Sequence, residues 1–244
     1  MTSFAIATHG LTHRYGSHTV LDELELEVPT GEIFGLLGHN GAGKTTTVCI
    51  LTTLLEATDG TARVAGFDIR TAPARVRSQI GYVPENVQFY DDLTLMENLR
   101  FFARLSGIAK PDAPIERTLE FLKFEGHESE RLGTFSKGMR QRVGLAQAMV
   151  HEPEVLFLDE PTSGLDPEGV RLLRETVVRL NAEAGTTIFM NTHLLSEVTK
   201  TCTSIGILRA GKLVHHDSLA GTLGAYPSED ALERAYFSSG TPVA

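Results

Sequence analysis

Short apolar runs separated by glycine, proline and polar residues fill the first 85 positions of the chain and predict a series of strands. The expected strands are residues 4–8, 11–15, 24–28, 32–37, 61–64 and 80–83, with a turn at Asp59 and Gly60 before the fifth. A helix is expected at 46–55, between the fourth and fifth strands. The N-terminal part is therefore predicted to be rich in β-structure.

Helical spacing replaces this pattern after position 90. Apolar residues recur at 95, 99, 102 and 105, which places their side chains on one face of a helix. Thr94 and Glu97 have the spacing of a capping box at its start. Further helices are expected at 115–124 and from Ser136 up to Pro153. Together these segments predict a helical insert.

Strands and helices alternate from residue 155 onward. The unbroken apolar run at 155–158 is typical of a strand buried on both faces of a parallel sheet. The later elements are expected to be a helix from Asp166, a strand at 186–191, a hairpin of 204–209 and 212–216, and a short helix near 230–237. This order predicts an α/β protein.

The composition fits one large domain, or one domain with a subdomain. The chain has 244 residues, of which 41% are hydrophobic, and its formal net charge is −9. This charge disfavours a surface that wraps nucleic acid, which requires clustered lysine and arginine. No secretory signal is visible, and no apolar run approaches the ~20 residues of a membrane span, so we expect a cytoplasmic protein.

Neither the cysteines nor the paired histidines indicate a metal centre. Cys49 and Cys202 are the only cysteines, and each lacks a second thiol at metal-ligand spacing, so both are expected to be free thiols. His215 and His216 are neighbours on an expected strand and would point to opposite faces. Two polar edge positions are therefore favoured over a shared metal ion.

A phosphate-binding loop is indicated between the strand at 32–37 and the helix at 46–55. It comprises Gly38, His39, Asn40, Gly41, Ala42, Gly43, Lys44, Thr45 and Thr46, with the spacing Gly, four residues, Gly-Lys-Thr. Main-chain N–H groups can surround a triphosphate only where no Cβ blocks their approach, and the glycines meet that need. Lys44 is expected to reach the outer phosphates and the Thr45 hydroxyl to bind Mg²⁺. A glycine-rich turn with a surface lysine is the alternative interpretation.

Two acidic residues follow the apolar run at 155–158. Ligands collect at the carboxyl ends of parallel strands. Hydrolysis of an outer phosphate needs charge neutralisation, an oriented water and a base. Asp159 is expected to hold the Mg²⁺ shell and Glu160 to polarise the attacking water. A solvated acidic pair at a strand end is the alternative.

The segment from Ser136 to Arg142, which opens a helix ahead of this acidic pair, resembles the signature motif of ABC ATPases. The other motifs occur in that family's order, with Tyr15 as the base-stacking aromatic, 38–46 as Walker A, Glu85 at the Q-loop, 155–160 as Walker B, 163–166 as the D-loop and His193 as the switch histidine. The resemblance covers roughly residues 4–216. Taken alone, Tyr15 fits a core position equally well.

The resemblance implies a P-loop NTPase fold of the α/β class. Its parts are a mostly parallel core sheet, an N-terminal antiparallel β subdomain and an α-helical subdomain insert. The implied ABC-type ATP-binding domain spans 1–220, with the helical subdomain at roughly 88–150 and a short tail at 221–244.

The same resemblance implies that ATP and Mg²⁺ bind between two copies of the chain, or between this chain and a related ATPase subunit. Ser136 and Gly138, at a helix start, would face the ATP on the partner's Walker A, and Asp166 would also belong to the nucleotide site. The implied catalytic residues are Lys44, Glu160 and His193, and the implied metal ligands are Thr45, Glu85 and Asp159. The protein would be the ATP-hydrolysing subunit of a transporter, held at the inner face of the membrane by a separate permease, with no nucleic-acid partner.

Two positions depart from the family pattern. Glu85 replaces the usual glutamine, and Lys137 replaces the usual second signature glycine. Both departures resemble the branch whose ATPase subunits serve multidrug, polysaccharide or copper-maturation exporters. The aromatic residues at 89–90 and 101–102 adjoin the Q-loop and fit either a permease docking site or core packing of the insert.

Two other functions remain as alternatives on the sequence. One is a soluble ABC-type ATPase that is not coupled to transport, and the other is a regulatory nucleotide-binding module that hydrolyses ATP weakly. The transported substance, the direction of transport, the choice between homodimer and heterodimer, and the role of 218–244 do not follow from the residues.

Overall fold

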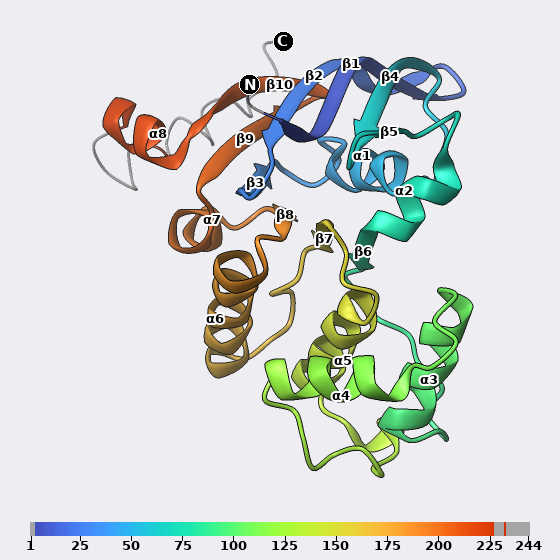
Figure 1. Ribbon diagram of the computed structural model, residues 1–244. Helices are drawn as coiled ribbons and strands as arrows, with labels where there is room; N and C mark the ends of the chain where they lie inside the picture. Colours follow the sequence, from blue (N-terminus) through green and yellow to red (C-terminus); the bar gives the residue numbers. More distant parts are fainter. Residues whose placement is uncertain (1–2, 227–231, 233–244) are drawn as a thin grey trace.

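A computed structural model describes residues 3–226 and 232 of the chain and arranges them as two sheets with flanking helices (Figure 1). The strands are β1 (Phe4–Tyr15), β2 (His18–Pro29), β3 (Ile33–Leu37), β4 (Asp59–Val64), β5 (Phe67–Asp68), β6 (Ile80–Val83), β7 (Val155–Asp159), β8 (Thr187–Thr192), β9 (Ser204–Arg209) and β10 (Lys212–Ser218). The helices are α1 (Lys44–Leu51), α2 (Pro73–Gln79), α3 (Leu95–Leu105), α4 (Asp112–Phe121), α5 (Lys137–Met149), α6 (Pro167–Ala184), α7 (Leu195–Thr201) and α8 (Leu219–Ala225), with a 3-10 turn at Leu132–Thr134.

The larger sheet positions the candidate chemistry. Its strand order is β10-β9-β3-β8-β7-β6, and every neighbouring pair is parallel except β9 with β10. Strands β3, β7 and β8 are buried along their whole length, as apolar runs in a parallel sheet require. Because these three strands are neighbours, the segments that follow them meet at one edge of the sheet.

The N-terminal strands form a separate four-stranded antiparallel sheet in the order β2-β1-β4-β5. In Figure 1 this sheet and α1 lie in the upper half, while α3, α4 and α5 gather at the bottom. The expected fold is therefore confirmed, with its parallel core sheet, antiparallel sheet and helical insert.

Two details of the antiparallel sheet differ from the expectation. Residues 4–8 and 11–15 belong to one strand, β1, because a register shift between Thr8 and Leu11 absorbs Gly10 without ending the pairing. The turn expected at Asp59 and Gly60 is wrong, since both residues begin β4. Gly60 is needed for a close approach instead, because a Cβ there would overlap the backbone of Gly10.

The helices also differ in their ends and number. Helix α1 begins at Lys44 and stops at Leu51, earlier than the expected 46–55, and α5 ends at Met149, four residues before Pro153. Helices α2, α7 and α8 were not expected. The short helix expected near 230–237 lies outside the described residues, apart from Leu232.

The helical insert confirms its predicted start. Thr94 caps α3 by accepting a hydrogen bond from the Glu97 N–H, and the Glu97 side chain accepts one from the Thr94 N–H. Buried leucines of α3 and α4 pack in the same core cluster as α5 and the larger sheet. The insert is thus joined to the sheet through α5.

Candidate functional site

The phosphate loop lies between buried strand β3 and helix α1, and its backbone requires glycine. Gly43 precedes α1 with a φ of 107°, and a Cβ there would lie 2.8 Å from Leu21 Cδ2 and 2.9 Å from the Val20 oxygen. Lys44 is buried, and its Nζ donates a hydrogen bond to the Gly38 carbonyl over 2.7 Å. The loop therefore folds back over the lysine that begins the helix.

The other loop residues complete this turn. The Ala42 N–H donates to the His39 carbonyl over 3.1 Å, and Asn40 and Gly41 are exposed at the tip. Thr45 is exposed and Thr46 is partly buried in the first turn of α1. Backbone N–H groups at a helix start and in such a turn favour an anion.

Glu160 lies between the phosphate-loop lysine and His193. Its Oε1 is 3.4 Å from Lys44 Nζ, and its Oε2 is 2.9 Å from His193 Nδ1. The Glu160 N–H donates to the Asn191 backbone oxygen and to Asn191 Oδ1, and Glu160 has a φ of 45°, which is rare for a residue with a side chain. Three side chains from the segments that follow β3, β7 and β8 thus converge.

Asp159 is the carboxylate next to the loop. The Thr45 hydroxyl donates to Asp159 Oδ1 over 3.4 Å. Burial raises the pKa of Asp159, and the charges of Glu160 and Glu85 raise it further. Burial and the nearby Asp159 also raise the pKa of Tyr82, which stays protonated. This crowding of carboxylates is the electrostatic setting in which a divalent cation is stabilising.

The donor set fits Mg²⁺ in part. A hydroxyl and a carboxylate are oxygen ligands of the kind Mg²⁺ prefers, together with phosphate oxygens. Within the described part of the chain, no group of three or more His, Cys, Asp or Glu residues forms a metal site alone. Thr45 and Asp159 would supply two of the oxygen ligands of such an ion.

Glu85 is held near the same carboxylates by the segment that follows Glu160. The Ser163 hydroxyl donates to Glu85 Oε1 over 2.9 Å. The sequence motifs included Ser163 but gave it no role, and Asn191 was missed altogether. The sequence signal of Asn191 was a polar residue directly after the apolar run at 188–190.

Ser136 and Gly138 lie at the N-terminus of the 13-residue helix α5. Ser136 is exposed and caps the helix by accepting a hydrogen bond from the Met139 N–H over 3.3 Å. Figure 1 shows α5 in the lower half and α1 in the upper half. No hydrogen bond or ion pair between residues 3–226 joins Ser136 to Lys44. The structure does not bring these two predicted parts of the site together within one chain.

The residues around this helix start are also exposed. Asp166 caps α6 by accepting a hydrogen bond from the Gly169 N–H over 2.9 Å. Lys137 is exposed, and its side chain lies over Gly164, since a Cβ on that glycine would come within 2.5 Å of Lys137 Nζ. Lys137 therefore contacts the D-loop of its own chain.

Tyr15 is exposed at the end of β1. Its side chain is 55% exposed, so the alternative of a core tyrosine is wrong. Its ring makes an edge contact with His13, with 4.6 Å between the ring centroids. An exposed ring at the rim of the sheet is available to stack on a base.

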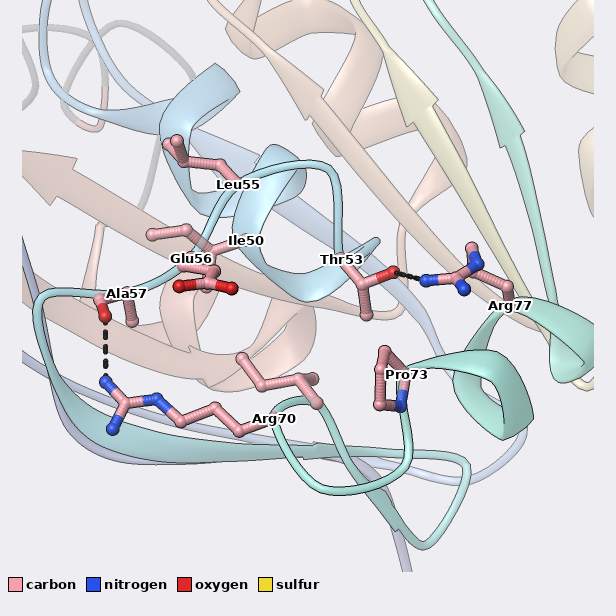
Figure 2. Close-up of a pocket in the computed structure, with 9 residues that line it drawn as sticks. Ile50, Thr53, Leu55, Glu56, Ala57, Arg70, Pro73 and Arg77 are labelled. Carbon is pink, nitrogen blue, oxygen red and sulfur yellow. Dashed lines mark hydrogen bonds between the residues drawn. The ribbon is translucent and has the colours of Figure 1, made fainter.

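A hollow of about 550 Å³ lies beyond the C-terminal end of α1 (Figure 2). Arg70 donates to the Ala57 carbonyl over 2.8 Å, and Arg77 donates to the Thr53 hydroxyl over 3.0 Å. Figure 2 shows the Glu56 carboxylate between these two arginines. The hollow is lined by charges of both signs and is separate from the phosphate loop.

A second hollow of about 560 Å³ shares Arg77 and lies between the ends of α1 and α3. Leu54 and Leu105 line it and are 63% and 70% exposed. Tyr90 and Phe101 are exposed on the same insert and contact each other, with 5.2 Å between the ring centroids. Exposed apolar side chains of this size indicate a contact surface.

Comparisons with known proteins agree with this geometry. The family model described as ABC transporter matches residues 21–163. The bacitracin transport ATP-binding protein BcrA of Enterococcus faecalis is 40% identical over 218 residues, which cover 89% of this chain and 70% of that protein. BcrA of Bacillus licheniformis is 42% identical over 213 residues, which cover 87% of this chain and 69% of that protein. A solved structure described as the ATP binding subunit of an ABC transporter has a TM-score of 0.84 at 31% identity and covers 96% of this chain and 100% of its own.

Proposed function

This chain belongs to the ABC transporter family as an ATP-binding subunit, and from this premise we propose that it hydrolyses ATP to drive a separate membrane permease. The observation that carries the proposal is the convergence of Lys44, Glu160 and His193 beside the phosphate loop. We also propose that the chain has the domain organisation implied by the family, with an ATP-binding domain at 1–220 that contains a helical subdomain at roughly 88–150.

Lys44 and Glu160 divide the work of hydrolysis. The loop N–H groups and the Lys44 amine bind the phosphates, so the contact between Lys44 and Glu160 is exchanged for one with the nucleotide. Glu160 then accepts a proton from the attacking water as general base. His193 Nδ1 holds Glu160 Oε2 and fixes the direction of the carboxylate. Tyr15 stacks on the base.

Thr45 and Asp159 are the residues that would hold Mg²⁺. The Thr45 hydroxyl and Asp159 Oδ1 lie 3.4 Å apart, and burial, followed by the charges of Glu160 and Glu85, raises the pKa of Asp159. Glu85 contributes a further carboxylate beside Asp159. When bound, the ion neutralises charge that develops on the phosphate oxygens.

A second copy of the chain, or a related subunit, completes the site. Ser136, which is exposed, and Gly138, which is partly buried, form an anion site at the start of α5 that the phosphate loop of the same chain does not reach. Head-to-tail pairing brings them to the nucleotide on the partner's loop, with Asp166 beside them. ATP then holds the two chains together, and hydrolysis releases them.

The permease docks on the hollow between the ends of α1 and α3. No helix among residues 3–226 is long and apolar enough to cross a bilayer. Leu54 and Leu105, with the nearby aromatic pair Tyr90 and Phe101, provide the exposed apolar surface for a helix of the membrane partner. This contact places the chain at the inner face of the membrane. The names of the BcrA relatives, which describe bacitracin transport ATP-binding proteins, support a role in the transport of an antibiotic compound.

ATP hydrolysis by purified variants tests the proposal. We expect the wild-type chain to hydrolyse MgATP and Glu160→Gln to bind ATP but lose about 100-fold or more of the rate, as removal of a general base does. Lys44→Ala loses nucleotide binding as well. Glu175→Gln removes an exposed carboxylate of α6 and serves as the matched control. A wild-type chain without activity, or a Glu160→Gln variant within tenfold of it, contradicts the proposal.

A further inference from the structure

Asn191 lies on β8, opposite Asp159 in the parallel pairing with β7, and Glu160 follows directly after Asp159. We propose that Asn191 is a positioning residue for ATP hydrolysis, and that its carboxamide holds the Glu160 side chain in the direction that a general base needs. The inference rests on the proposed function, because it concerns the same site. The Asn191 side chain bonds the backbone of Glu160, so it acts through Glu160 rather than on the phosphates.

The acceptor end of the Asn191 side chain holds an unusual backbone turn. Glu160 has a φ of 45°, a conformation that costs free energy for a residue with a side chain and persists only where the surroundings hold it. The Glu160 N–H donates to the Asn191 carbonyl over 3.0 Å and to Asn191 Oδ1 over 2.9 Å. One residue of β8 therefore supplies two acceptors for this N–H, and the second belongs to its side chain.

The donor end of the same side chain lies near a carboxylate. Asn191 is fully buried, and its Nδ2 makes no hydrogen bond of ordinary geometry within the described part of the chain. Burial raises the pKa of Asp159, whereas the nearby N–H groups of Asn191 lower it. A carboxamide has one acceptor end and one donor end, and here each end lies beside its complement. The side chain consequently has one favoured orientation, with Oδ1 toward the Glu160 N–H.

The contacts of Glu160 explain why this orientation matters for the reaction. Its carboxylate lies 3.4 Å from Lys44 Nζ and 2.9 Å from His193 Nδ1. Once the phosphates bind the Lys44 amine, the first of these two contacts is lost. The direction of the carboxylate then depends more on the backbone turn at Glu160, which the Asn191 side chain helps to fix. A small displacement of a reacting group lowers a rate by up to about 100-fold.

Steady-state ATP hydrolysis by Asn191 variants tests this role. Asn191→Leu keeps most of the side-chain volume and removes the acceptor, and Asn191→Ala removes the whole carboxamide. We expect each variant to lower kcat at least about tenfold, because the general base loses its direction. KM for ATP, and the Kd for ATP measured by equilibrium binding, are expected to stay within about twofold of wild type, since the phosphate loop is unchanged.

A double-mutant cycle with Glu160→Gln shows whether Asn191 acts through the general base. Residues that act as one unit give rate losses that do not add. In the Glu160→Gln background, Asn191→Leu is therefore expected to lower the residual rate by less than about twofold. Single-turnover hydrolysis with excess protein over ATP measures rates this slow.

Thr187 provides a matched control at the other end of β8. It is fully buried like Asn191, and its hydroxyl accepts a hydrogen bond from the Gly31 N–H over 2.9 Å. Thr187→Val therefore also removes a buried side-chain acceptor from a backbone N–H while it keeps the shape. We expect it to lower Tm but to leave kcat within about twofold, because Thr187 begins the strand and the catalytic residues lie beyond its other end.

The opposite results overturn the inference. A kcat loss below about tenfold in a folded Asn191 variant, a loss that appears in KM instead, or a loss of twofold or more in the Glu160→Gln background shows that Asn191 does not act through the general base. An equal fall of kcat in Thr187→Val, or a failure of both Asn191 variants to fold, shows a purely structural role. An inactive wild-type chain contradicts the proposed function itself, whereas an active wild type with unaffected Asn191 variants contradicts only this inference.

Discussion

Glu160, the proposed general base, shows how backbone conformation positions a side chain. Its φ of 45° turns the chain directly after β7, and two hydrogen bonds from its N–H to Asn191 stabilise this conformation. The carboxylate is then held between Lys44 and His193. The contacts with these two neighbours therefore fix the direction of the proposed general base.

Replacing Glu85 by glutamine is expected to change the ATPase rate only modestly. A glutamine carbonyl can accept the hydrogen bond that Ser163 gives to Glu85 Oε1, and the change removes one negative charge beside Asp159. We therefore expect Glu85→Gln to keep the ATPase rate within about tenfold of wild type, or ~1.4 kcal/mol of activation free energy. Steady-state hydrolysis checks this, and a loss as large as that of Glu160→Gln would show that Glu85 has a specific catalytic role.

Residue types at fixed spacing allowed part of the site to be predicted. Lys44 and Glu160 followed from the chemistry that a triphosphate needs, and the structure brings them within 3.4 Å. Asn191 was missed, because the sequence does not show that its side chain bonds the backbone of a residue 31 positions away. The exposure of Tyr15 was undecided, since an aromatic residue at a strand end fits core and surface alike.

At the scale of elements, apolar runs predicted the strands that carry the site better than the helices around it. Strands β3, β7 and β8 are short and fully buried, so each appears as an apolar run. Helix α2 buries only Val76 and has no apolar periodicity, while α7 and α8 have seven residues each. Such short elements depend on tertiary contacts that local sequence does not show.

The capping box of α3 allows a test of how much this helix start stabilises the insert. Thr94→Ala removes one half of its capping box, so we expect the free energy of unfolding to fall by about 1 kcal/mol. This corresponds to a Tm lower by roughly 2–4 °C for a chain of this size. Thermal unfolding followed by circular dichroism measures the change. Thr94→Ser keeps the oxygen and is expected to melt like wild type; if the alanine variant does so too, the cap does not stabilise the insert.

The whole molecule keeps the two parts of the proposed nucleotide site apart. Lys44 and its neighbours lie at the edge of the larger sheet, whereas Ser136, which is exposed, and Gly138, which is partly buried, lie on the helical insert. The order of motifs was sufficient to predict this architecture, because each motif sits at the end of a buried strand or the start of a helix. The pairing of two chains was implied by the family resemblance alone, since one chain contains only one half of each interface.

The mass of the Glu160→Gln variant in solution, measured by sedimentation with and without MgATP, tests this central claim most directly. Blocking hydrolysis keeps ATP in place, so we expect twice the mass of a single chain with MgATP and the mass of one chain without nucleotide or with ADP. Adding Ser136→Arg to the same variant is expected to abolish pairing while ATP still binds. A Glu160→Gln variant that binds ATP and remains a single chain would contradict the account.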